Sequence, residues 1–357
     1  MVVGSVREVA REVIFTSEDP PGGGPAAGLV AGVRRALAQP NDAPTDAPND
    51  AIVTLPADAP LGGQAASTLL SRLESDPTAH AVVGVDANGL EQPLQLAMRP
   101  EGAAALVAAA GPGGAAGVSA RRLLDALRPG LVSQQLAPAE LWDIDTPDQL
   151  LAWRLRSSTA VAAILDLVGR HRVAVADRPV VLAIDGPSCA GKSILAIAVA
   201  LRSGASVLEG DDFYRHTLPQ LTVSQREVMS DAAVVGAVID WERLRDQALL
   251  PLRAGKSATF QPYDWETDDG RLAPPKTIPA ADLIIVEGVY AARPEFANLL
   301  DSAVYLGVDP QTRARRYAER ENDPDWARFW ERGEAYYFSA LRPPASFDLQ
   351  LHDEDLR

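Results

Sequence analysis

One short segment, GPSCAGKS at residues 186–193, restricts the fold of this chain more than any other. It satisfies the pattern Gly-x-x-x-x-Gly-Lys-Ser/Thr, follows the apolar run VVLAI and precedes the apolar segment SILAIAVALRSG. Glycines in such a loop let backbone N–H groups turn inward around phosphates, and the following helix directs its positive end at the same anion. We therefore predict a strand, a phosphate-binding loop and a helix in direct succession.

The positions of this loop have distinct expected roles. The Lys192 ammonium would reach the β- and γ-phosphates and act in catalysis, and the Ser193 hydroxyl would coordinate Mg²⁺. For Cys189, at a variable position, a small residue that fits is a simpler interpretation than a redox role. Nucleotide contacts are expected from all eight residues, namely Gly186, Pro187, Ser188, Cys189, Ala190, Gly191, Lys192 and Ser193.

Acidic residues follow two later apolar runs. Asp211 and Asp212 come directly after VLEG, and Glu287 ends the run DLIIVE. An apolar run that stops at an acid is usually a strand that reaches solvent. In a phosphate-loop domain, however, such a position also lets a carboxylate hold Mg²⁺ directly or through water, so Glu287 is a candidate metal ligand.

The motifs GPSCAGKS, GDDFYR, QPYDW, IIVEGVY and TRARRYAER occur in the order found in uridine kinase-like phosphate-loop kinases, and residues 160–357 resemble that family. The resemblance implies ATP and Mg²⁺ as cofactors and transfer of the γ-phosphoryl group to a hydroxyl, with catalysis by positioning and charge neutralisation. It implies that Asp211 accepts the proton of the acceptor hydroxyl. Tyr214 and Tyr263 would line the acceptor pocket, and Glu287 would support Mg²⁺.

The arginines of TRARRYAER have two interpretations. By the resemblance, Arg313, Arg316 and Arg320 form a lid helix over the phosphates, with Arg316 acting in catalysis. The alternative is a solvated helix face. We favour the lid because a phosphoryl group in transfer needs guanidinium partners.

The sequence departs from the uridine and cytidine kinases at one place. Those enzymes carry a His-Pro-Asp segment before a Phe-Asp, with an aspartate that holds the ribose hydroxyls, whereas this chain has VVGAVIDWERL. Asp240 and Trp241 keep the second half of the pattern, so Asp240 is a candidate substrate residue. The ribose-holding acid itself is replaced by small apolar residues, and uridine is therefore expected to be a poor substrate. The aromatic stretch at residues 326–338 is expected to be helix core rather than a surface for base stacking.

The first half of the chain alternates short apolar runs with alanine- and leucine-rich segments. AIVTLP, AHAVVGV and QPLQLAM are typical of strands, whereas AAGLVAGVRRALA and AASTLLSRLE have helical spacing. Such alternation predicts an α/β fold with a largely parallel sheet.

EDPPGGGPAAGL, LPADAP, QPL and WDIDTPDQL in this half resemble molybdenum cofactor guanylyltransferases (MobA-like) and the related molybdopterin cytidylyltransferases. The resemblance implies that Asp58 holds Mg²⁺ on the nucleotide and that Asp143 or Asp145 is the second acid. The family begins with a strand and a glycine-rich loop that grips the triphosphate, and no such segment precedes MVVGSV. We expect an N-terminally incomplete domain, with a truncated start favoured over a non-catalytic remnant.

The expected architecture is α/β with two domains, each a mostly parallel sheet flanked by helices. A Rossmann-like, nucleotidyltransferase-like domain is expected at residues 1–155 and a phosphate-loop kinase domain at residues 177–357, with a helical connection at residues 156–176.

Charge and composition exclude several classes of protein. A net charge of −15 argues against non-specific binding of nucleic acids and of anionic membranes. One cysteine excludes an internal disulfide framework, and the four histidines lack zinc-ligand spacing. Without a run of about 18 apolar residues or a signal-like start, we expect a cytoplasmic protein whose partner is a small-molecule phosphoryl acceptor.

Three hypotheses for function follow from these observations. The first is an ATP-dependent small-molecule kinase behind an incomplete nucleotidyltransferase-like domain. The second is a molybdenum cofactor nucleotidyltransferase with a regulatory phosphate-loop domain. The third is a non-catalytic nucleotide-binding regulator. Asp211 discriminates among them, because only a kinase needs a base beside the acceptor.

Overall fold

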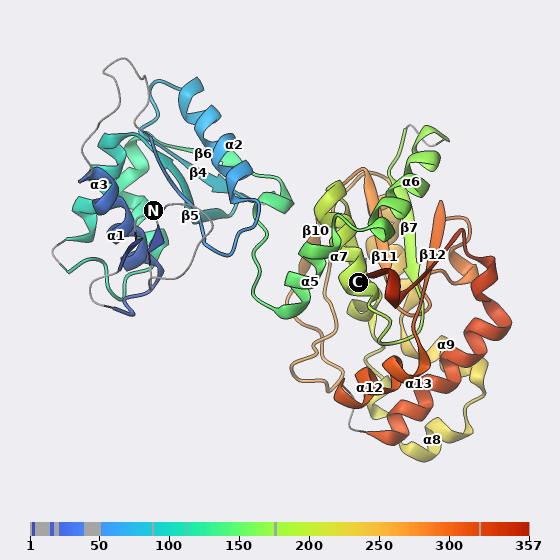
Figure 1. Ribbon diagram of the computed structural model, residues 1–357. Helices are drawn as coiled ribbons and strands as arrows, with labels where there is room; N and C mark the ends of the chain where they lie inside the picture. Colours follow the sequence, from blue (N-terminus) through green and yellow to red (C-terminus); the bar gives the residue numbers. More distant parts are fainter. Residues whose placement is uncertain are drawn as a thin grey trace. The chain divides into compact units, whose positions relative to one another are not determined.

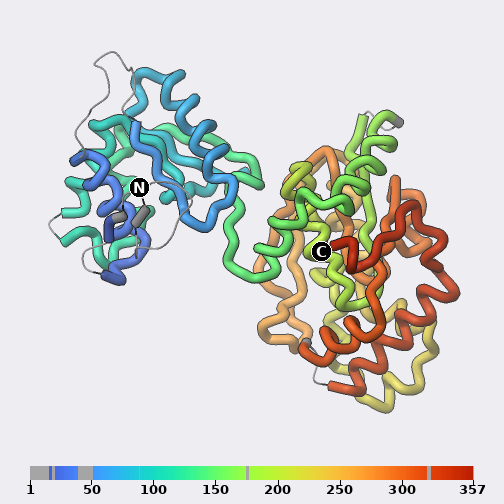
Figure 2. Tube along the Cα trace, in the orientation of Figure 1, coloured from blue at the N-terminus to red at the C-terminus, as the bar shows by residue number. Residues whose placement is uncertain are grey.

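The computed structural model describes residues 2–3, 15–17, 21–38, 51–87, 89–111, 113–174, 177–320 and 323–356. The chain forms two compact units, Met1–Asp145 and Thr146–Arg357. Each unit is made from one continuous part of the chain, as the colours along the trace show (Figure 2).

The division between the units lies ten residues before the expected boundary at residue 155. Helices α5 (Pro147–Leu155) and α6 (Thr159–Ala174) both pack against α7 (Lys192–Ser203). Leu155 and Ile164 belong to the same buried cluster as Leu195 of α7. Residues 156–176, expected as a connection, therefore fall inside the second unit, because their apolar side chains are part of its core.

The first unit contains short strands and helices in alternation (Figure 1). In chain order they are β1 (Val2–Val3), β2 (Phe15–Thr16), α1 (Pro25–Leu37), β3 (Ile52–Thr54), α2 (Gly62–Ser75), β4 (Ala81–Val85), β5 (Glu91–Met98), α3 (Pro100–Ala110), α4 (Ala120–Leu123) and β6 (Leu131–Gln135).

The main sheet of this unit has the strand order β3-β5-β4-β6. Strand β5 is antiparallel to β3 and to β4, and β4 is parallel to β6, so three of the four strands run in one direction. Strand β4 is buried along its whole length: Ala81 and Val83 pack with α1 and α3, whereas Val82 packs with α2. Because both faces of β4 are covered, its sequence is apolar without interruption.

The second unit begins with α5 and α6 and continues through a five-stranded sheet. Its further main elements are β7 (Val180–Asp185), α7, β8 (Ser206–Glu209), α8 (Val223–Val228), α9 (Asp231–Val238), α10 (Trp241–Leu244), α11 (Leu250–Arg253), β9 (Ala258–Phe260), β10 (Lys276–Ile278), β11 (Leu283–Glu287), β12 (Ser302–Gly307), α12 (Pro310–Arg320), α13 (Pro324–Tyr336) and β13 (Leu349–His352).

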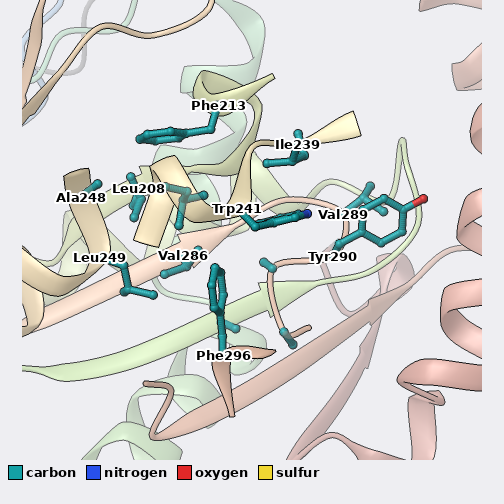
Figure 3. Packing of buried hydrophobic residues seen from close by; sticks show 14 of the residues in the cluster. Leu208, Phe213, Ile239, Trp241, Ala248, Leu249, Val286, Val289, Tyr290 and Phe296 are labelled. Atoms are coloured by element: carbon teal, nitrogen blue, oxygen red, sulfur yellow. The ribbon is translucent and has the colours of Figure 1, made fainter. Parts of the chain in front are cut away.

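This sheet has the order β13-β12-β7-β11-β8, and every pairing within it is parallel. The side chains of β7 divide between two cores: Leu182 and Ile184 pack with α5–α7, whereas Val181 and Ala183 face the cluster around Trp241. Figure 3 shows Trp241 of that cluster among Ile239, Val286 and Phe296. A parallel sheet places the carboxyl ends of all its strands at one edge, which is where such folds bind ligands.

The expected α/β class with two mostly parallel sheets is confirmed, with β5 as the strand that runs against the others. Among the described residues, no helix has both the length and the apolar character needed to cross a membrane.

Candidate functional site

The phosphate-binding loop joins β7 to α7, as its sequence predicts. Gly186 has a φ of +148°, and a Cβ at this position would clash with the carbonyl oxygen of Leu306 on the neighbouring strand β12. Gly191 has a φ of +101° and stands directly before the first residue of α7. Both glycines are therefore required by the backbone itself, which explains the spacing of the motif.

The two ligand-directed side chains of the motif have partners within the protein. The ammonium of Lys192, a largely buried residue, donates to the carbonyl oxygen of Pro187 at 2.9 Å. The Ser193 hydroxyl donates to Oε1 of Glu287 at 3.0 Å. Glu287 is the last residue of β11 and pairs in register with Ile184 of β7, so the parallel sheet brings its carboxylate to the loop.

Glu287 lies in an environment that disfavours a negative charge. Burial, and then repulsion by Asp211, raise the pKa of its carboxyl to about 7, and the Lys192 ammonium acts in the opposite direction. A cation beside Ser193 and Glu287 would offset this cost, so the pair fits the Mg²⁺ that the sequence predicted here. Within the described residues, no group of three or more His, Cys, Asp and Glu side chains could hold a metal.

Asp211 and Asp212 lie in one 3₁₀ turn, Gly210–Phe213, directly after β8. The Asp212 carboxylate accepts a hydrogen bond from the Lys276 ammonium at 2.8 Å, and its side chain is 11% exposed. Asp211 instead lies close enough to Glu287 to raise the pKa of that residue. The structure therefore joins Ser193 to Glu287, whose pKa both Lys192 and Asp211 influence, and pairs Asp212 with Lys276, which also lies 3.7 Å from Glu209.

Tyr214 and Tyr263, predicted to line the acceptor pocket, contact each other edge to face with ring centroids 5.2 Å apart. Trp265 packs on both rings, 4.9 Å from Tyr214 and 4.7 Å from Tyr263. The Tyr263 hydroxyl donates to Asp268 at 2.6 Å. Burial raises the pKa of both tyrosines, so they are neutral at physiological pH and can act only as aromatic surfaces and hydrogen-bonding groups.

Asp240, the third predicted substrate residue, is the N-cap of the short helix α10. Its carboxylate accepts a hydrogen bond from the backbone N–H of Arg243 at 3.2 Å. Its own N–H donates to the Phe213 carbonyl at 2.7 Å, which joins α10 to the turn that carries Asp211. Trp241, the next residue, is buried in the core (Figure 3). The role that these contacts give Asp240 is to position the turn.

Two of the three predicted lid arginines reach the loop region from α12. Arg316 donates to the carbonyl oxygen of Cys189 at 3.0 Å and also pairs with Asp353 at 3.2 Å. Arg313 pairs with Glu334 of α13 at 2.7 Å. The prediction for Arg320 concerns a side chain outside the described residues.

Sequence reasoning missed Asp185, the last residue of β7. Its carboxylate is fully buried and accepts hydrogen bonds from the backbone N–H groups of Gly186, Tyr290 and Ala292 and from the Tyr337 hydroxyl. Burial raises the pKa of this carboxyl to about 6. An acid at the end of a buried strand, directly before the first loop glycine, was the available signal. Asp185 ties the loop to two segments distant in sequence.

Glu334 was also missed, although it lies against the loop. The carboxylate is almost fully buried, and its Oε1 accepts hydrogen bonds from the Ser188 backbone N–H at 3.1 Å and from the Ser188 hydroxyl at 2.5 Å. No local pattern pointed to it, since Glu334 and Ser188 are 146 positions apart in the chain.

The first unit has a separate cavity of about 550 Å³. Asp58 and Asp143 both line it, together with Arg121 and Ser119, whereas Asp145 is not among the lining residues. A backbone hydrogen bond from Ile144 to the carbonyl oxygen of Asp58, at 3.1 Å, holds the two acidic segments together. Of the two alternatives for the second acid, the structure places Asp143 beside Asp58. The expectation of a missing glycine-rich loop concerns sequence ahead of Met1, and it stays a prediction.

Solved structures similar to this chain include two kinases. One is described as "a Possible Uridine Kinase from Bacillus stearothermophilus": it is 24% identical, the match covers 53% of this chain and 99% of that one, and the TM-score is 0.37. The other is the phosphoribulokinase from Rhodobacter spheroides, with 16% identity, coverage of 49% and 70%, and a TM-score of 0.36.

The search of curated proteins produced no match. Residues 1–130 match the family model described as MobA-like NTP transferase domain, and a domain of this kind is therefore present in the first unit.

Proposed function

We propose that the second unit is an ATP-dependent kinase that transfers the γ-phosphoryl group to a hydroxyl of a small molecule. One observation carries the proposal: the buried Glu287 carboxylate accepts a hydrogen bond from Ser193 of the phosphate-binding loop, at the carboxyl edge of a parallel sheet, and Asp211 acts on its charge. A metal-binding pair and a second acid at one loop are the groups that phosphoryl transfer requires.

Each residue has a defined task in this proposal. The loop N–H groups and Lys192 bind the phosphates, and Ser193 with Glu287 holds Mg²⁺, which supplies positive charge beside them. Asp211 accepts the proton of the acceptor hydroxyl while the oxygen of that hydroxyl forms the bond to phosphorus and ADP leaves. Arg316, which now donates to the Cys189 carbonyl oxygen, is within reach of the phosphates for charge neutralisation.

The acceptor is a nucleoside or a related small molecule that binds at Tyr214 and Tyr263. Since the Asp240 carboxylate caps α10, its hydrogen-bonding capacity is partly used by the fold. This contact of Asp240 supports the expectation that uridine is a poor acceptor. We also propose that the reaction takes place in the cytoplasm.

The test is ATP turnover by the full chain against a panel of nucleosides, sugars and pantothenate-like alcohols. We expect at least one alcohol to yield ADP and a phosphomonoester in equal amounts, with uridine well below the best acceptor. The Asp211→Asn variant is the matched control for background hydrolysis. ATP binding without phosphorylation of any alcohol would favour a regulator and contradict the kinase.

A second candidate function belongs to the first unit, where Asp58 and Asp143 share one cavity with Arg121. We propose that this cavity binds a Mg²⁺–nucleotide, as two carboxylates near one metal ion are the usual requirement of nucleotidyl transfer. Molybdopterin is the acceptor to test with labelled GTP and CTP. If the first unit binds the labelled nucleotide but does not transfer it to molybdopterin, the unit binds nucleotides without catalysing nucleotidyl transfer.

A further inference from the structure

Glu334 occupies hydrogen-bond donors of the phosphate-binding loop. It lies near the end of α13 and is only 3% exposed. Its Oε1 accepts hydrogen bonds from both the backbone N–H and the hydroxyl of Ser188, the third residue of the loop. Hydrogen bonds to an ionised carboxylate are about twice as strong as neutral ones, so this contact competes effectively with any other anion for the same donors.

The neighbouring cations of the loop are engaged in the same way. Arg313 pairs through its guanidinium with the other carboxylate oxygen of Glu334, at 2.7 Å. The Lys192 ammonium donates to the Pro187 carbonyl oxygen at 2.9 Å. A nucleotide phosphate would need these same positive groups, which Glu334 and the Pro187 carbonyl oxygen now engage.

The same face of α13 also covers the predicted acceptor residue. Trp326, Trp330 and Glu334 follow one another at intervals of four residues and therefore lie on one side of the helix. The Trp326 and Trp330 rings lie 6.4 and 6.1 Å from the Tyr214 ring, measured between centroids. Helix α13 packs against α8 and α9, with which it is grouped in Figure 1, and Arg332 joins it to Asp231 of α9.

We propose that Glu334 is an internal competitor of the nucleotide, and that its carboxylate leaves Ser188 before a terminal phosphate binds there. The inference rests on the proposed function of the second unit. Two anions cannot share the Ser188 donors, and a carboxylate beside a triphosphate is repelled by it. Arg313, freed from Glu334, then becomes available to the phosphates. Because Trp326 and Trp330 lie on the same helix face, release of Glu334 is coupled to the opening of the surface around Tyr214.

The test is calorimetric measurement of the ATP–Mg²⁺ dissociation constant for the natural chain, Glu334→Gln and Glu334→Asp. Glu334→Gln removes the charge at unchanged size, and Glu334→Asp keeps the charge but withdraws it from Ser188 by one methylene. We expect both to bind ATP at least about fivefold more tightly, the usual lower range of coupling between competing sites. Glu331→Gln, an exposed position on the same helix, is the matched control and should leave affinity unchanged.

The melting temperature without ligand separates competition from a merely structural role. Competition predicts that the Glu334 variants melt at a lower temperature but bind ATP more tightly than the natural chain. A structural role predicts that their melting temperature and their ATP affinity both fall. Equal or weaker ATP binding by the variants, with clear binding by the natural chain, would overturn the inference and leave the proposed function standing. Failure of every form to bind ATP would overturn both. Failure of both Glu334 variants to fold would make Glu334 a requirement of the fold and would also overturn the inference.

Discussion

The two candidate sites of this protein differ in how their polar groups are satisfied. In the first unit, Asp58 and Asp143 line a cavity of about 550 Å³. In the second unit, the groups suited to bind phosphate already have internal partners: Ser188 binds Glu334, and Lys192 binds the Pro187 carbonyl oxygen. The first site can accept a ligand by adding contacts, whereas the second must exchange one set of contacts for another.

This difference has an energetic consequence. A site that exchanges partners gains only the difference between the new and the old interactions, so its affinity is sensitive to groups that never touch the ligand. In the second unit those groups are Glu334 and Asp185, which hold the loop in its present form. For the first unit we expect affinity to follow the residues that line the cavity.

The largest effect is expected for Lys192→Ala in the second unit. Phosphorylation of the acceptor should fall below detection, because the developing negative charge loses its nearest ammonium. The lost hydrogen bond to Pro187 should lower the melting temperature by no more than about 4 °C. Parallel assays of phosphoryl transfer and thermal unfolding check this, and equal losses of stability and activity would show that Lys192 serves the fold instead.

Asp211→Asn should reduce kcat by roughly 10²- to 10⁴-fold with little change in ATP affinity, the range for loss of a positioned general base. Asp212→Asn should retain most of kcat and lower stability by about 1 kcal/mol, since it breaks a partly exposed ion pair with Lys276. Steady-state kinetics and denaturant unfolding of the two variants separate these effects. A larger loss of kcat for Asp212→Asn would transfer the role of the base to Asp212.

Glu287 should make Mg²⁺-dependent ATP binding depend on pH. With a pKa of about 7, its carboxyl is mostly protonated at pH 6 and mostly ionised at pH 8. The affinity should therefore rise roughly tenfold over that interval, because only the ionised form binds Mg²⁺. Titration calorimetry at several pH values measures this rise, which Glu287→Gln should abolish.

The same raised pKa affects the stability of the ligand-free unit in the opposite direction. Between the ordinary glutamate value of 4.5 and about 7, native Glu287 keeps a proton that the unfolded chain releases. Its contribution to the free energy of unfolding is therefore complete below about pH 4.5 and is lost as the pH rises through about 7. A natural chain whose stability rises over this interval more steeply than that of Glu287→Gln would refute the assignment.

The smallest effect is expected in the first unit. Asp58→Asn should weaken binding of a Mg²⁺–nucleotide to that unit by about fivefold, the scale of one lost favourable contact. Phosphoryl transfer by the second unit should stay unchanged, because Asp58 lies in the other unit. Nucleotide titrations of Asp58→Asn in a Lys192→Ala background isolate the first site. A simultaneous loss of kinase activity in the single variant would show that the two sites are coupled.

Much of the fold could be predicted because its signals are local. The strand, loop and helix around Gly186 and Gly191 were expected from eight contiguous residues, since the backbone conformation itself requires those glycines. The buried strands β4 and β11 were expected from uninterrupted apolar runs. The boundary between the units was misplaced because the apolar spacing of α5 and α6 indicates helices but not the core against which they pack.

The sequence by itself determined which residues form the loop and that Glu287 ends an apolar strand, because glycine conformation and the extent of an apolar run depend on neighbours in the chain. Only the tertiary structure decided the partners of those residues: Lys276 for Asp212, Glu334 for Ser188, and the Tyr337 hydroxyl for Asp185. These partners are 64, 146 and 152 positions apart in the chain. Such pairs follow from strand order and helix packing, which bring distant segments to one edge of the sheet, and no periodicity within a segment carries that information.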